Sequence, residues 1–178
     1  YLEEFPQKRD ELRYVLTSIA PETGDSEFTW ADFQTRVNSE LVGILGNLVH
    51  RVLVLHHKYF EGITDRPLSC GHAPTKKAVA SMYDDLQLHM EAHKQRQALQ
   101  AVMQLARHGN RYLTEMEPWK LWKTDPAATR EVLEDMLYLL AHLSCGLQVF
   151  LPDTASKLQA MLGLEGPIPW DRELIWDK

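Results

Sequence analysis

The segment that decides the fold is FTWADFQTRVNSELVGILGNLVHRVLVLHHKYFEG, which spans Phe28–Gly62. It predicts one helix of about thirty residues, far longer than the usual three or four turns. Thr29 suits the N-cap position, and Gly62 suits the left-handed conformation that commonly ends a helix. Apolar residues recur every three or four positions and predict one stripe along this helix. They are Trp30, Phe33, Val37, Leu41, Ile44, Leu48, Val52, Leu55 and Tyr59.

A line of polar residues borders this stripe. At about 100° per residue these side chains fall within a narrow arc of the predicted helix. Asn47 and Arg51 are one turn apart, so they can act together on one ligand. The arc is either the solvated edge of a core helix, which periodicity alone favours, or the lining of a ligand groove. Its members are Arg36, Glu40, Asn47, Arg51 and Lys58.

The rest of the chain predicts an all-α fold, an antiparallel helical bundle with short loops. A polar connector, PETGDSE, precedes the long helix and predicts a joint, so we expect residues 1–27 to form one unit and residues 28–178 the bundle. The apolar tail, with Trp170, Ile175 and Trp176, is expected to pack back on the bundle. Further helices are predicted in the first 20 residues and near residues 75–92, 97–116, 125–150 and 154–162, with a break near 93–96.

Composition sets limits on function. The chain has 178 residues, is 44% hydrophobic and has a net charge of −6, which argues against broad, sequence-blind nucleic-acid binding but leaves room for a local basic site. Cys70 and Cys145 are far apart and form no CxxC motif, so we expect a reduced, cytoplasmic protein. No apolar run is long enough to cross a bilayer, so a membrane is not an expected partner.

Motifs for catalysis and for metal binding are missing from the sequence. His89 and His93 lie one helical turn apart, but the order HMEAH lacks the HExxH pairing of ligands and base. The nearest approach to a glycine-rich phosphate loop, Gly43–Gly46, lies inside the predicted long helix. We therefore expect no catalytic residue, no metal and no cofactor in this chain.

The corner at residues 107–123 differs from the rest of this acidic chain. It holds four basic residues against Glu115 and Glu117, a local charge of +2, together with three aromatic rings. Rings that stack on bases and cations that meet phosphates suit unstacked nucleotides. The alternative is that Trp119 caps the core and the cations are solvated. The basic residues are Arg107, Arg111, Lys120 and Lys123, and the rings are Tyr112, Trp119 and Trp122.

Two stretches, DFQTRVNSELVGILGNLVHR and ARHGNRYLTEMEPWK, resemble the C-terminal helical domain of methionyl-tRNA synthetases. The shared pattern is Asn47 and Arg51 on a long helix, then Asn110–Tyr112 leading to Pro118 and Trp119. The resemblance covers essentially the whole chain, and residues 1–27 resemble the end of the family's catalytic half.

The resemblance implies that Asn47, Arg51, Pro118 and Trp119 contact the CAU anticodon of a tRNA, chiefly its cytosine. Candidate phosphate contacts are Arg111, Lys120 and Lys123. The implied partners are the tRNA and the catalytic domain of the same chain, whose HIGH and KMSKS motifs do not occur in this sequence. ATP, with zinc as a candidate metal, would belong to that catalytic half of a methionine–tRNA ligase. The chain, which starts at Tyr1 without methionine, would be an inactive fragment of it.

Two alternatives remain open at this point. Other class I synthetases, for leucine, isoleucine, valine or cysteine, share the helical architecture. A helical bundle that binds a protein partner through its aromatic tail, with no role in RNA binding, would also fit the composition.

Overall fold

The computed structural model describes residues 1–22, 24–63 and 69–164, and structural statements refer to these ranges. It confirms the predicted all-α bundle, and the described residues contain no strand. None of their helices is both long and apolar enough to span a membrane. The elements are α1 (Arg9–Ser18), α2 (Trp30–Arg36), η1 (Val37–Gly46), α3 (Asn47–Phe60), α4 (Ala73–Glu91), α5 (Gln95–Met116), α6 (Pro118–Leu121), α7 (Pro126–Gln148) and α8 (Pro152–Met161).

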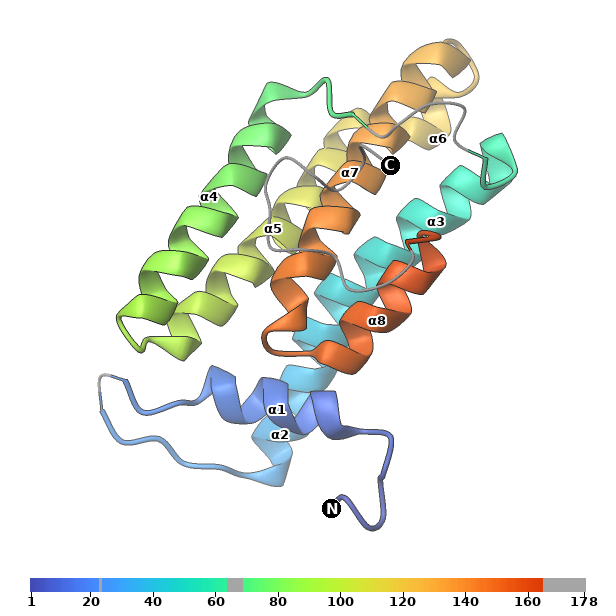
Figure 1. Cartoon of the computed structure of the whole chain (residues 1–178). Coiled ribbons are helices and arrows are strands. Elements are labelled where there is room, and N and C mark those ends of the chain that lie inside the picture. The colour runs from blue at the N-terminus through green and yellow to red at the C-terminus, as the bar shows by residue number, and fades with distance from the viewer. Residues whose placement is uncertain (23, 64–68, 165–178) are drawn as a thin grey trace.

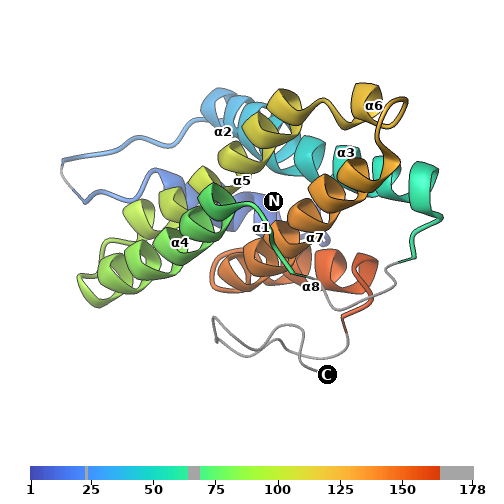
Figure 2. The same ribbon diagram turned by 90° about the horizontal axis from the view of Figure 1, so that it is seen from above.

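Helix α7 lies at the centre of the bundle, between the α4–α5 hairpin and the pair formed by α3 and α8 (Figures 1 and 2). Asp125 caps its start by accepting a hydrogen bond from the Ala128 amide at 2.9 Å, and Pro126 occupies its first position. Leucines recur every three or four positions along α7, and all of them in this row are buried: Leu133, Leu137, Leu140, Leu143 and Leu147.

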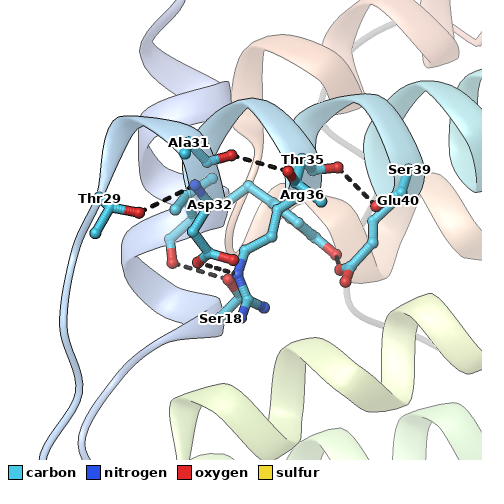
Figure 3. Close-up of polar contacts among 10 residues, drawn as sticks. Ser18, Thr29, Ala31, Asp32, Thr35, Arg36, Ser39 and Glu40 are labelled. Atoms are coloured by element: carbon cyan, nitrogen blue, oxygen red, sulfur yellow. Dashed lines mark hydrogen bonds and ion pairs between the residues drawn. The ribbon is translucent and has the colours of Figure 1, made fainter.

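The predicted long helix is continuous from Trp30 to Phe60. Its N-cap is confirmed, because the Thr29 hydroxyl accepts a hydrogen bond from the Asp32 amide at 3.1 Å, and Asp32 in turn pairs with Arg36 at 2.6 Å (Figure 3). At the other end, Glu61 already has a left-handed backbone, with φ of 54°, and Gly62 follows with φ of 77°. The predicted glycine is therefore the second left-handed residue of this end.

The middle of the long helix, η1, is a π-helix, which the sequence analysis did not predict. Its wider turns bring each amide near the carbonyl five residues earlier. A Cβ on Gly43 would lie 3.2 Å from the Asn38 carbonyl oxygen, and one on Gly46 would lie 3.3 Å from that of Leu41. The two glycines therefore leave space for the carbonyls of their own helix.

Two residues of the predicted polar edge have hydrogen-bond partners on different helices. Glu40 accepts a short hydrogen bond from the hydroxyl of Tyr14 on α1, whereas Asn47 contacts Asn110 on α5. The apolar stripe is confirmed from Phe33 to Tyr59, because its members there are buried or packed against the core, with Leu45 and His56 buried beside them. Trp30 is the exception: it is 59% exposed in a ring cluster with Tyr1, Phe28 and Phe33.

The boundaries between the later helices lie at residues with special backbone properties. The break between α4 and α5 occurs at His93, whose φ is 56°. Both α6 and α8 begin at a proline, where the missing amide of Pro118 or Pro152 costs no helical hydrogen bond. The stretch after Pro118 is therefore a short helix. The predictions for Trp170, Ile175 and Trp176 fall outside the described residues.

Helix α1 is held against the end of α7 and the start of α8. Arg13 donates to the Phe150 carbonyl at 2.8 Å, and the carboxylate of Asp10 accepts from the Thr154 amide at 2.6 Å. An ion pair of 3.1 Å joins Arg9 and Asp153 at the surface. The first residues of the chain are therefore bonded to its last described helices.

The imidazole of His142 lies in the centre of the core, 1% exposed, with Nδ1 3.1 Å from the Tyr83 hydroxyl. Burial lowers its pKa from 6.5 to about 4, because the charged form would lose its hydration. The folded protein therefore holds this ring neutral over a range of pH in which the unfolded chain binds a proton.

We expect this histidine to weaken the fold in acid. The free energy of unfolding should fall as pH drops from 6.5 to about 4, by about 3 kcal/mol in total, since only the unfolded chain takes up the proton. Urea unfolding across this range, compared with His142→Gln, isolates the contribution because other groups titrate in both proteins. Parallel stability–pH curves for the two proteins would contradict the assignment.

Candidate nucleic-acid interface

The candidate site forms where α5 crosses the start of α3. A Cβ on Gly109 would lie 2.9 Å from Leu48 Cδ2 and 3.3 Å from Leu139 Cδ1, both on buried side chains. A glycine at position 109 therefore lets α5 and α3 approach more closely than a residue with a side chain would. As a result, the next residue, Asn110, lies at the edge of the crossing and beside Asn47.

The side-chain amide of Asn110 bridges the two helices. Its nitrogen donates to the Ile44 carbonyl at 2.9 Å and to the Ala106 carbonyl at 3.2 Å. Its oxygen accepts from the side-chain nitrogen of Asn47 at 3.3 Å. The sequence analysis quoted Asn110 only as part of a motif, although its place after an inward-facing glycine is a signal for a position at a helix crossing.

One turn after Asn47, Arg51 lies against the ring of Trp119. The guanidinium carbon is 5.5 Å from the ring centroid, within the range of a cation–π interaction. Trp119 is half-buried on α6, whose first residue, Pro118, is buried. The structure thus brings an amide, a guanidinium and an indole to one corner, and their role in binding stays a prediction.

The second indole of the corner is engaged in the fold. Trp122 is half-buried and stacks on Tyr59 with 4.7 Å between centroids, and it meets Phe60 edge-on at 5.4 Å. Both partner rings come from the end of α3. Trp122 therefore ties α6 to α3 and leaves Trp119 as the ring of the corner that adjoins Arg51.

The four predicted basic residues differ in their exposure and in their partners. Arg111 and Lys123 are exposed, with an Arg111 guanidinium nitrogen 3.5 Å from His108 Nδ1. Lys120 is exposed but forms an ion pair of 2.7 Å with Glu117. Arg107 is half-buried at the Tyr14–Glu40 contact, where its charge favours the phenolate, so it lies away from the corner.

A buried carboxylate fixes the loop that leads into α4. Asp135 of α7 accepts hydrogen bonds from the Tyr112 hydroxyl at 2.8 Å and from the Gly71 amide at 2.7 Å, and it is 5% exposed. Burial, followed by the hydrogen bond to this carboxylate, raises the pKa of Tyr112. Asp135 was not predicted from the sequence, although an aspartate among the leucines of a core helix indicates a buried polar contact.

This network extends towards Arg111. The ring of His72 stacks on Tyr112 with 4.1 Å between centroids, and its Nδ1 lies 2.8 Å from the Thr75 hydroxyl. The same hydroxyl is 3.0 Å from Nε2 of His108, whose pKa is lowered by burial and then by the Arg111 charge. A neutral His108 imposes less charge repulsion on Arg111 than a protonated ring would.

Other features do not contribute to the corner. Among the described residues, no group of three or more histidines, cysteines or carboxylates is placed to bind a metal. His89 and His93 therefore have no third ligand within the described residues. A groove of about 790 Å³ lies between α1, η1, α3 and α8, with a mainly apolar lining that includes His50 but none of the candidate residues.

Two family profiles match parts of this chain. Residues 72–175 match the family profile of the anticodon binding domain of methionyl tRNA ligase, and residues 1–53 match that of class I tRNA synthetases (M). The methionine–tRNA ligase of Porphyromonas gingivalis is 47% identical over 174 residues, which is 97% of this chain and 26% of that protein. The ligase of Phocaeicola vulgatus is 45% identical over 177 residues, 97% of this chain and 25% of that protein.

A solved structure is similar over most of the chain. The apo methionyl-tRNA synthetase of Mycobacterium tuberculosis superimposes with a TM-score of 0.74 at 26% identity, covering 93% of this chain and 34% of that one. The chain spans about a quarter of the length of the curated relatives. Since one profile alone matches more than half of its residues, the chain belongs to the family of the anticodon-binding domain of methionyl-tRNA ligase.

Proposed function

We propose that this chain binds the CAU anticodon loop of a methionine tRNA at the corner formed by α3, α5 and α6. The observation that carries the proposal is the pair of contacts that gathers three recognition groups: Asn47 with Asn110 at 3.3 Å, and Arg51 over Trp119 at 5.5 Å. The family match supports the kind of ligand.

The chemistry of the corner suits cytosine. Its pairing edge presents one amino donor and two acceptors, one of them the ring nitrogen. The carbonyl oxygen of Asn47 would accept from the amino group, and the Arg51 guanidinium would donate to the acceptors. Uracil has an acceptor in place of the amino group and a donor at the ring nitrogen, so both contacts would be mismatched.

Stacking would add affinity without selecting a base. An anticodon base turned out of its loop would lie on the Trp119 indole, as unstacked bases lie on aromatic side chains in many RNA-binding proteins. Such stacking is worth about 1–3 kcal/mol per base. Pro118, buried at the start of α6, would contribute by fixing the position of the indole.

The proposed role of the whole protein follows from its relatives. We infer that this chain works with a catalytic domain that attaches methionine to the tRNA with ATP, in the cytoplasm, and that any zinc belongs to that domain. Residues 1–27 would form the end of the catalytic half. The chain itself would supply recognition without catalysis.

Removal of either recognition side chain should weaken binding. We expect Arg51→Ala and Trp119→Ala each to cost about 1–3 kcal/mol, since one deletes a base contact and the other a stacking platform. Fluorescence anisotropy with a labelled CAU stem-loop measures the change. His50→Ala is the matched control, because this neighbouring residue lines the apolar groove. Unchanged affinity in both variants would refute the site.

Changing the first anticodon base should also weaken binding. A stem-loop with uracil in place of this cytosine should bind about 1–3 kcal/mol less tightly, because the donors and acceptors no longer match. A loop altered outside the anticodon serves as the control. Equal affinity for the cytosine and uracil loops would exclude base readout by Asn47 and Arg51.

The exposed cations should determine the salt dependence. Lys123→Ala should reduce the slope of log affinity against log salt by about 0.7, the value for one phosphate contact on a single strand. Lys94→Ala, in the turn at the far end of α5, is the control and should leave the slope unchanged. If Lys123→Ala behaves like this control, Lys123 contacts no phosphate.

A further inference from the structure

The orientation of the Asn110 amide is determined by its surroundings. One end of the amide lies 2.9 Å from the Ile44 carbonyl oxygen and 3.2 Å from that of Ala106. Carbonyl oxygens accept hydrogen bonds and never donate, so this end must be the NH₂ group. The opposite orientation would place three oxygens together without a proton between them.

The fixed amide of Asn110 in turn orients Asn47. Since both protons of the Asn110 NH₂ are committed to carbonyls, the atom that faces Asn47 is its oxygen. Asn47 must then present its own NH₂ group, at 3.3 Å, which leaves its carbonyl oxygen pointing away from α5. Asn47 is exposed, so a ligand can reach this oxygen.

We propose that Asn110 is a positioning residue that sets the preference for cytosine at the first anticodon position by holding the Asn47 amide in one orientation. The inference rests on the proposed function. In the held orientation Asn47 offers an acceptor, which suits the amino group of cytosine. Rotated by half a turn, the same side chain would offer a donor, which suits the O4 atom of uracil.

The held orientation matters because Asn47 has little else to fix it. As an exposed side chain at the start of α3, it loses its bond to α5 when Asn110 is removed. Both orientations of its amide then become accessible, at the cost of a simple side-chain rotation. Asn110 would thus act on the choice of base through Asn47, without a contact of its own to the base.

The test compares the affinities of cytosine and uracil stem-loops for the same protein. In Asn110→Ala we expect the cytosine-to-uracil affinity ratio to fall by about fivefold or more, the lower limit for one base contact. A merely structural role would weaken both loops in parallel and leave the ratio unchanged. Thr114→Ala is the control, because its hydroxyl bonds the Asn110 backbone carbonyl at 2.8 Å and not the amide.

A second variant separates orientation from packing. In Asn47→Asp both side-chain oxygens accept, so rotation changes nothing, and adding Asn110→Ala should leave the affinity ratio as it is in Asn47→Asp. An unchanged ratio in Asn110→Ala overturns the role of Asn110, as does a drop in the ratio that persists when Asn110→Ala is combined with Asn47→Asp. A wild-type chain that fails to distinguish the two loops overturns the proposed function itself.

A measurement on the unaltered chain covers the case in which Asn110→Ala does not fold. Nuclear Overhauser effects should connect the side-chain NH₂ protons of Asn47 to protons of Asn110, and they should persist with the cytosine loop bound. The Asn47 signal is assigned by its loss in Asn47→Asp. Absence of these contacts in the free chain would overturn the proposal.

Discussion

The close crossing of α5 over the start of α3 is the constraint on which the candidate interface depends. Leu48 is fully buried beneath it, so it has little room to move away from a side chain at residue 109. The missing methyl group of Gly109 lets Asn110 reach the Ile44 carbonyl. The same approach directs the end of α5 so that α6 follows beside α3, where Trp119 meets Arg51.

Much of the fold could be predicted because the signals are local. The caps at Thr29 and Asp125, and the apolar period of α7, depend only on residues a few positions apart. The π-helix could not be predicted, because a change from four- to five-residue hydrogen bonding has no distinct residue pattern. In the structure Gly43 and Gly46 face carbonyls of their own helix.

The candidate site was predictable to the extent that it follows helical spacing. Asn47 and Arg51 were paired from their separation by one turn. Trp119 was a candidate from the basic and aromatic composition of its corner, and resemblance to a known family joined it to that pair. The packing of Trp122 could not be predicted, because the ring that stacks on it, Tyr59, belongs to a helix far away in the sequence. The Asn110 side chain is held by a hydrogen bond to the Ile44 carbonyl. A contact to a backbone atom of this kind cannot be predicted from a pattern of side chains.

The contact between Arg51 and Trp119 has a consequence for the thermodynamics of association. Long side chains that become immobilised on binding typically lose about 0.5–1.5 kcal/mol each in conformational entropy. Here the guanidinium and the indole already restrain one another before any ligand arrives. A pre-organised pair of this kind lets more of each new contact contribute to net affinity, so even a small surface can hold a flexible polymer.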